Sequence, residues 1–143
     1  MFTSKDINLV VLTMGHKRAE NLTGLQSPPH DVFVIYGLID PKLIIPAGAV
    51  IYITVINLDD NMYHNFVITT ESPPYPYNVM MGEGMMSGFV AMMPLLPPAN
   101  YQNGYAYEFS YTVQLSQAGI YWYICTYPGH AQEGMYGEMI VIG

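Results

Sequence analysis

The chain is dominated by short runs of β-branched and aromatic residues that Pro, Gly and Asn separate. Val50–Asn57 reads V-I-Y-I-T-V-I-N, and Tyr105–Val113 alternates polar with apolar residues, as on a strand with one buried face. The other candidate strands are Ile7–Thr13, Val32–Tyr36, Lys42–Ile45, Asn65–Thr70, Gly119–Ile124 and Gly137–Ile142. Only Glu20–Leu25 favours a turn of helix. Short strands with frequent turn signals predict an all-β protein, as an antiparallel sandwich or barrel.

The net charge and the small number of charged residues exclude several classes of function. Four Lys and Arg stand against eleven Asp and Glu, for a formal net charge of -7, so the chain offers no basic surface to nucleic acid or to an anionic membrane. Only 10% of the residues are charged and 51% are hydrophobic, which argues against disorder. Few Lys and Arg also suit an acidic medium, in which carboxylates lose their charge and basic groups keep theirs.

The N-terminal sequence does not indicate the compartment in which the protein works. The apolar run Ile7–Thr13 is too short to cross a bilayer, which needs about 20 residues. The order of segments that marks a secretory signal is absent. We therefore expect no transmembrane segment, and either a cytoplasmic protein or one whose leader or anchor is missing from this sequence.

The segment Cys125–Met135 brings a thiol, an imidazole and a thioether into one short loop with C-x4-H-x4-M spacing. A lone Cys in a β protein is usually core, and a lone His near a turn is usually solvated. The joint pattern, with Pro128 and Gly129 inside the loop and a strand on either side, is hard to reach by chance. Soft sulfur with imidazole nitrogen suits copper, whereas harder ions prefer carboxylates. The loop predicts Cys125, His130 and Met135 as copper ligands.

A trigonal copper site of this kind needs a second imidazole, and the chain offers His16, His30 and His64. His64 follows Val50–Asn57 and precedes the run that ends at Thr70, so its side chain can project from the end of a sheet. His16 and His30 lie in loop-like sequence and are expected on the surface. We therefore assign His64 as the remaining ligand.

These residues give the chain a resemblance to the cupredoxins, above all to rusticyanins and to the sulfocyanins of acidophilic microbes. The shared features are Pro46–Gly48, His64–Phe66 and the segment Tyr121–Gly137. The resemblance covers residues 31–143, which we expect to form the core of a single domain over 1–143, with 1–30 as an N-terminal extension of unassigned role. It implies a Greek-key β-sandwich of about eight strands with copper at one end.

The resemblance also implies a role for each site residue. It implies one type 1 copper ion held by His64, Cys125, His130 and the axial Met135. His130 would be the exposed ligand through which electrons pass. Asn65 and Thr126 would surround the ligands, with the Asn65 amide tying the His64 loop to the Cys125 loop. Ordinary turn chemistry is the alternative for Asn65 and Thr126.

The expected function is one-electron transfer by copper cycling between Cu(II) and Cu(I), in the respiratory chain of an acidophile. We do not expect an enzyme, because all ligands are filled and catalytic metals keep an open position. A monomer in the periplasm or elsewhere outside the cytoplasm is expected, with membrane association through a segment absent from this chain left open. Its partners would be redox proteins, a cytochrome or a terminal oxidase. The alternatives are a copper carrier or buffer that uses the Met-rich loop and a metal-free adhesion sandwich, which leaves the Cys125 loop unexplained.

The Pro- and Met-rich stretch 71–102 fits no strand, and loops of this length are usually functional or poorly ordered. We expect Met80–Met93 to form an apolar collar around His130, with gap-filling in the core as the alternative. The expected docking surface for partners comprises Met85, Met86, Tyr127 and Pro128. A competing hypothesis is steering of a basic partner by Asp59, Asp60, Glu83 and Glu133.

Overall fold

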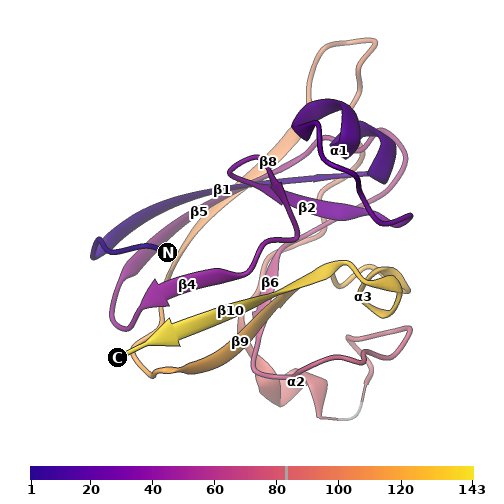
Figure 1. The fold of residues 1–143 in the computed structure, drawn as a ribbon. Helices are drawn as coiled ribbons and strands as arrows, with labels where there is room; N and C mark the ends of the chain where they lie inside the picture. The colour runs from indigo at the N-terminus through magenta and orange to yellow at the C-terminus, as the bar shows by residue number, and fades with distance from the viewer. Residues whose placement is uncertain (83) are drawn as a thin grey trace.

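Two β-sheets packed face to face form the protein in a computed structural model that describes residues 1–82 and 84–143. The first sheet has the order β3-β2-β1-β5-β8, from β1 (Asp6–Met14), β2 (Val32–Ile35), β3 (Leu38–Ile39), β5 (Val50–Asn57) and β8 (Tyr107–Gln114). The second has the order β4-β10-β9-β6-β7, from β4 (Leu43–Pro46), β6 (Val67–Thr69), β7 (Phe89–Ala91), β9 (Gly119–Ile124) and β10 (Tyr136–Ile142). Both termini lie at one end of the sandwich, and helices α1 (His16–Thr23) and α3 (His130–Glu133) lie at the other (Figure 1).

The all-β sandwich predicted from the strand runs is confirmed. Every predicted run contains a strand, with small shifts at the ends. The short strands β3 and β7 were missed, so the described part of the chain has ten strands rather than about eight. The sheets are also mixed rather than wholly antiparallel, because β1 pairs in parallel with β5 and β4 in parallel with β10.

Residues 1–30 supply an inner strand of the first sheet. β1 pairs along its length with β5 and is also bonded to β2, so it lies between them. Its side chains alternate, with Ile7, Leu9 and Val11 buried in the core. Helix α1 follows directly and overlaps the predicted helical turn only in part. Its start was missed because Gly15, the residue before it, gives no side-chain capping bond for a sequence pattern to find.

An aromatic cluster fills the core where the two sheets face each other. The rings of Phe33 and Phe66 both pack against Tyr123, with centroid distances of 5.2 and 5.0 Å, and meet each other at 5.5 Å. Any side chain on Gly137 would overlap the Tyr123 hydroxyl, so this position of β10 needs glycine. Tyr123 lies on β9 two residues before Cys125, so the cluster packs against the end of that strand and supports it.

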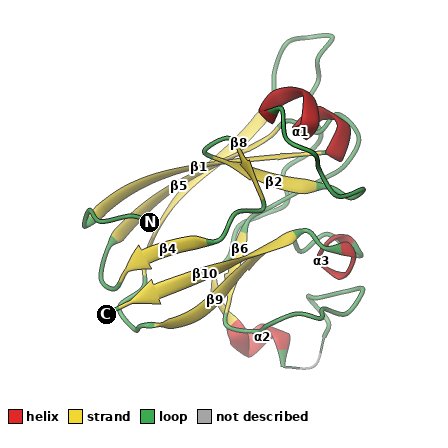
Figure 2. Ribbon diagram, viewed as in Figure 1, coloured by secondary structure: helices red, strands yellow, loops and turns green. Residues whose placement is uncertain are grey.

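The Pro- and Met-rich stretch packs against the core over much of its length. It contains the short helix α2 (Met85–Gly88), which Figure 2 shows below the second sheet. β7 and a backbone bridge between Leu96 and His64 follow. The side chains that it buries are Tyr75, Val79, Met85, Met93 and Leu96. Among the described residues, no helix has the length and apolar character needed to cross a membrane.

Candidate metal centre

The hairpin loop between β9 and β10 carries Cys125, His130 and Met135 at one end of the sandwich. Gly129 and Gly134 flank α3 with φ values of 87° and 125°, a region that glycine adopts without steric cost. The Met135 N–H donates to the His130 carbonyl at 2.9 Å, and the Cys125 N–H donates to the Met135 carbonyl at 3.4 Å. The backbone therefore folds the loop so that its three candidate ligands are neighbours.

His64 reaches the same place from the connection between β5 and β6. Its backbone forms a two-way bridge with Leu96, which fixes the loop against the Pro-rich stretch. The fully buried Asn57 side chain organises the loop, since its amide donates to the carbonyls of Met62, Leu96 and Pro97 at 3.0 to 3.1 Å. His64 is fully buried as a result.

The structure brings the three predicted equatorial ligands together. The Cys125 Sγ lies 3.4 Å from His130 Nδ1 and 3.7 Å from His64 Nδ1. The three donor atoms all lie within 4.8 Å of one another. Cys125, His64 and Met135 are fully buried, and His130 is 6% exposed. One thiolate and two imidazole nitrogens at this spacing form the donor set that suits copper in a trigonal site.

Two carboxylates that sequence reasoning missed lie behind the imidazoles. His64 Nε2 is 2.8 Å from Asp59 Oδ2 and 3.4 Å from Asp31 Oδ2, and His130 Nε2 is 3.7 Å from the same Asp31 oxygen. Asp59 lies only five residues before His64, and its position in the same loop was an unused signal. Asp31 offered no such signal, because only the tertiary fold brings it to the site.

The two imidazoles differ in their electrostatics. Burial lowers the pKa of His64, but the hydrogen bond to Asp59 and the neighbouring Cys125 outweigh it and raise the pKa to about 9. Burial, together with the nearby His64, lowers the pKa of His130 to about 4. At neutral pH the His130 side chain is therefore a neutral imidazole, the form that binds a metal.

Asn65 and Thr126 join the two ligand loops directly. The Asn65 amide donates to Thr126 Oγ1 at 2.8 Å, and its carbonyl oxygen accepts the Thr126 N–H at 2.8 Å. The same amide donates to the Met93 carbonyl at 3.1 Å. These bonds span 61 residues of sequence, which turn chemistry within one loop does not do.

A depression opens over His130, and no described residue of Met80–Met93 lines it. Its described lining consists of His16, Pro29, His30, Asp31, Met62, Tyr77, Tyr127, Pro128, His130 and Glu133. Tyr127 packs on His130 with ring centroids 4.7 Å apart, and Tyr63 stacks on Tyr127. Predicted docking residues Tyr127 and Pro128 thus lie at the site.

The prediction that Met85 lies on the docking surface is wrong. Its side chain is only 5% exposed because it packs into the core from α2. Met86, the next residue, is 57% exposed but does not border the depression. His16 and His30, expected on the surface, are half-buried beside the site, and the His30 ring lies against Gly134.

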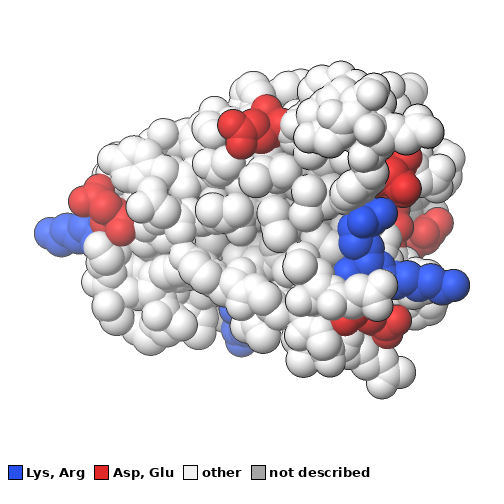
Figure 3. All heavy atoms as spheres, turned by 90° about the horizontal axis from the view of Figure 1, so that it is seen from above, with Lys and Arg blue, Asp and Glu red and all other residues white. Residues whose placement is uncertain are grey.

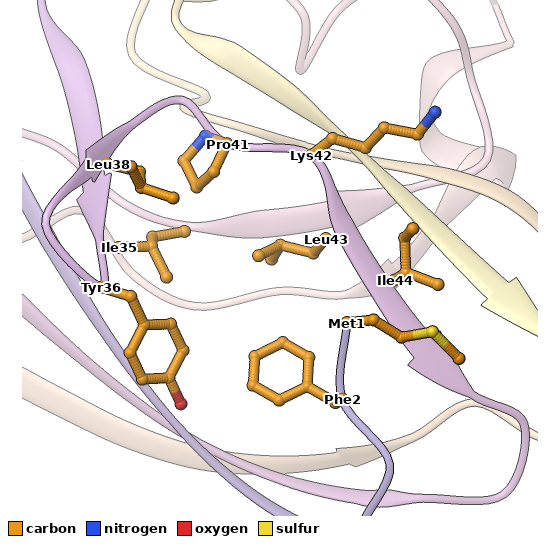
Figure 4. Close-up of a pocket in the computed structure, with 9 residues that line it drawn as sticks. All are labelled: Met1, Phe2, Ile35, Tyr36, Leu38, Pro41, Lys42, Leu43 and Ile44. Atoms are coloured by element: carbon orange, nitrogen blue, oxygen red, sulfur yellow. The ribbon is translucent and has the colours of Figure 1, made fainter.

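A second hollow lies apart from the ligands, at an edge of the sandwich (Figure 4). Its lining comes from the N-terminus, the β2–β3 hairpin and β4, and is mostly apolar, with Phe2, Leu38 and Leu43 among its residues. It contains none of the predicted ligands.

Comparisons with known proteins agree with this architecture. The family model of the sulfocyanin (SoxE) domain matches residues 37–143. Rusticyanin from Acidithiobacillus ferridurans is 34% identical over 120 residues, which are 79% of this chain and 56% of that protein. A rusticyanin from Acidithiobacillus ferrooxidans is 35% identical over 113 residues, covering 79% of this chain and 68% of that protein. The chain thus spans little more than half the length of the first of these relatives.

Solved structures extend the similarity to nearly the whole chain. A structure of reduced rusticyanin matches 99% of this chain and 82% of its own, with a TM-score of 0.76 at 30% identity. Another, described as the copper protein rusticyanin, matches with a TM-score of 0.77 at 29% identity, over 99% of this chain and 80% of its own. The second of these structures is that of a copper protein, and the Cys125, His64 and His130 donor set of this chain fits copper. The chain therefore belongs to the sulfocyanin (SoxE) family of cupredoxins and is similar to rusticyanin.

Proposed function

We propose that this chain holds one copper ion through His64, Cys125, His130 and the axial Met135, and that it carries single electrons between redox proteins. The observation that carries the proposal is the convergence of the Cys125 Sγ and two Nδ1 atoms at one buried end of the sandwich. Bound copper would supply the one-electron couple. The residues of this chain supply the cage around it.

The two loops that carry the proposed ligands are held rigidly. The ligands come from two loops that the Asn65–Thr126 bonds join, and each loop is further fixed by backbone bonds. Because close-packed interiors resist small displacements, the ligands would keep one geometry in both oxidation states. His130 is the ligand that reaches the surface, so electrons would enter and leave at its edge within the depression.

The finer assignments extend this proposal. A respiratory role in an acidic medium is supported by the scarcity of Lys and Arg and by the similarity to rusticyanin. We propose a monomeric single-domain carrier outside the cytoplasm, with a cytochrome or a terminal oxidase as its partner. We do not propose an enzyme, because the buried donor set offers no open position for a substrate.

The arrangement of the methionines does not favour the alternative of a copper buffer. Met85 and Met93 are buried as packing residues, and the Met93 sulfur accepts the Phe66 N–H at 3.4 Å. Met81, Met86 and Met92 are exposed. The buried methionines of Met80–Met93 therefore fill gaps in the hydrophobic core, which was the alternative to an apolar collar around His130.

An absorption spectrum of the oxidised, copper-loaded protein tests the proposal. A thiolate beside two imidazoles gives strong sulfur-to-copper charge transfer, so we expect one copper per chain and an intense visible band. Cys125→Ser should abolish the band, while His16→Ala, which changes a histidine outside the ligand set, should keep it. An intense band that survives Cys125→Ser would refute the ligand assignment.

A further inference from the structure

The outer nitrogens of both ligand imidazoles face carboxylates, although their inner nitrogens face the thiol. Asp59 Oδ2 lies 2.8 Å from His64 Nε2, and Asp31 Oδ2 lies within 3.4 Å of His64 Nε2 and 3.7 Å of His130 Nε2. A single carboxylate oxygen of Asp31 therefore stands between the two rings. Removing a carboxylate from water costs free energy unless the charge is paired. The position of these two carboxylates behind the imidazoles therefore suggests that they have a function there.

Asp59 is held in position by bonds that have nothing to do with a metal. Its side chain is buried, and its other oxygen, Oδ1, accepts the Asn61 N–H at 2.9 Å. Its own N–H donates to Asn57 Oδ1 at 3.0 Å, and Asn57 Oδ1 also accepts the Thr13 hydroxyl at 2.9 Å. The backbone of Asp59 is thus tied through Asn57 to β1 and to the end of β5, and the Asn61 N–H fixes the carboxylate itself.

We propose that Asp59 and Asp31 are positioning residues: Asp59 holds the Nε2–H group of His64 through a hydrogen bond, and the charge of Asp31, at 3.4 and 3.7 Å from the two Nε2 atoms, favours a proton on Nε2 in both rings, so that both Nδ1 atoms present lone pairs to copper. This inference rests on the proposed function. An imidazole that donates from Nε2 must carry its free lone pair on Nδ1, which is the atom turned toward Cys125 in both rings. A carboxylate partner also makes the ring a stronger donor, which favours Cu(II) over Cu(I).

The two carboxylates have unequal roles. Asp59 is buried and makes the short contact, so it governs the orientation of the buried ligand His64. Asp31 is 24% exposed at its side chain, makes longer contacts and is shared between both rings. It also lines the depression over His130, where a docking partner would alter its surroundings.

The chain provides a matched control in Asp60, the residue next to Asp59. Its side chain is 59% exposed and pairs with Arg18 at 3.7 Å, and no contact joins it to either imidazole. Asp60→Asn removes the same charge at nearly the same place in the sequence. A difference between Asp59→Asn and Asp60→Asn therefore reports the contact with His64 rather than net charge.

The experiment measures the reduction potential at fixed pH and, independently, the imidazole ¹⁵N signals of the diamagnetic Cu(I) protein. Asp59→Asn should shift the ratio of Cu(II) to Cu(I) affinity by about tenfold toward Cu(I), a rise of about 59 mV for one electron, and should move the His64 Nε2 signal. Asp31→Asn should raise the potential less and move the signals of both ligand histidines. Asp60→Asn should change neither readout.

Equal shifts in Asp59→Asn and Asp60→Asn, or His64 signals that stay unchanged in Asp59→Asn, would overturn the proposal. If Asp59→Asn does not fold, Asp31→Asn decides the question, because signals of both rings that do not move would equally overturn it. A coloured parent protein with unaffected variants refutes only the role of the carboxylates. A parent protein that stays colourless with copper refutes the proposed function itself.

Discussion

Met135 is the proposed axial ligand, and an axial thioether binds copper only weakly. It is fully buried, and its backbone is bonded to those of both Cys125 and His130. Met135→Gln should lower the reduction potential, since a harder oxygen donor favours Cu(II), and Met135→Leu should raise it, since the donor is lost. Each shift should be on the order of 59 mV, a tenfold change in relative affinity. Electrochemistry that finds both variants equal to the parent would remove Met135 from the site.

Asn65 offers a test of how the ligand loops are held. Asn65→Ala removes three hydrogen bonds and leaves the buried Thr126 N–H without its partner. Burying an unpaired donor costs about 1–3 kcal/mol, so the free energy of unfolding should fall by about that amount. Denaturant unfolding of the metal-free variant measures it. Asn8→Ala, at an exposed position of β1, should change stability by less than about 0.5 kcal/mol, and an equal loss in both variants would contradict the linking role.

At the residue scale, local patterns were enough to single out His64, Cys125 and His130, which the structure brings together. Cys125, His130 and Met135 follow one local spacing, and His64 was found because it lies between two strong strand patterns. Asp31 reaches the imidazoles only through the packing of β2 against the ligand loops, and no local pattern records that. Met85 was misplaced because a methionine in a loop gives no periodic signal for burial.

Among the elements, the β2–β3 hairpin is followed directly by a half-buried carboxyl group, that of Asp40. Asp40 Oδ1 accepts the Phe33 N–H at 2.8 Å, and the Asp40 N–H donates to the Phe33 carbonyl at 2.8 Å. Burial raises the pKa of Asp40 to about 7, although the bond from Phe33 opposes the rise. In the unfolded chain an aspartate titrates near 3.9. The folded protein therefore prefers protonated Asp40 over the interval between the two values.

Asp40 should make the protein more stable in acid. A folded-state pKa above the unfolded one gives stability that is complete below about pH 4 and is lost as the pH rises toward about 7. Asp40→Asn cannot ionise, so the melting temperature of the parent minus that of the variant should decrease across this interval and stay constant below it. Thermal melts of both proteins at several pH values measure the difference. A constant difference from pH 4 to pH 7 would show that Asp40 ionises normally in the folded state.

Strands with strong local sequence patterns were predicted well, and strands without such patterns were missed. β5 and β9 were predicted with correct ends because β-branched and aromatic residues fill them and turn residues bound them. β3 and β7 are too short to show an alternating pattern, and each is defined by its pairing with one neighbour, β3 with β2 and β7 with β6. The parallel pairing of β1 with β5 depends on the path of the chain through α1, which side-chain alternation does not encode.

At the scale of the whole molecule, the surface carries little charge with which to steer a partner. In the face drawn in Figure 3, acidic and basic side chains form a few small groups separated by uncharged surface. Among the acidic residues proposed for steering, Asp59 is buried, Asp60 is paired with Arg18, and Glu83 lies outside the described residues. Glu133 remains, and it lines the depression beside His130.

Apolar contact around the His130 depression is therefore the docking mode that we expect. Tyr77 is 63% exposed there, and its carbonyl accepts the Gly129 N–H at 2.7 Å, so it is fixed next to the ligand. Electron carriers must release their partners quickly, which favours an interface below about 1,200 Å². Charge-steered association slows steeply with added salt, whereas apolar docking does not.

The rate of electron transfer to a redox partner, measured over a range of salt concentrations at the working pH, decides between these modes. We expect a nearly flat profile for the parent protein. Tyr77→Asp should slow transfer because it places a charge in the depression, and Met86→Asp, which adds the same charge on α2 outside the depression, should have little effect. Slower transfer in Met86→Asp alone would place docking on the Met-rich segment instead. A steep fall in the parent rate with salt would refute apolar docking and would leave Glu133 and Asp31 as the charges that guide a basic partner to His130.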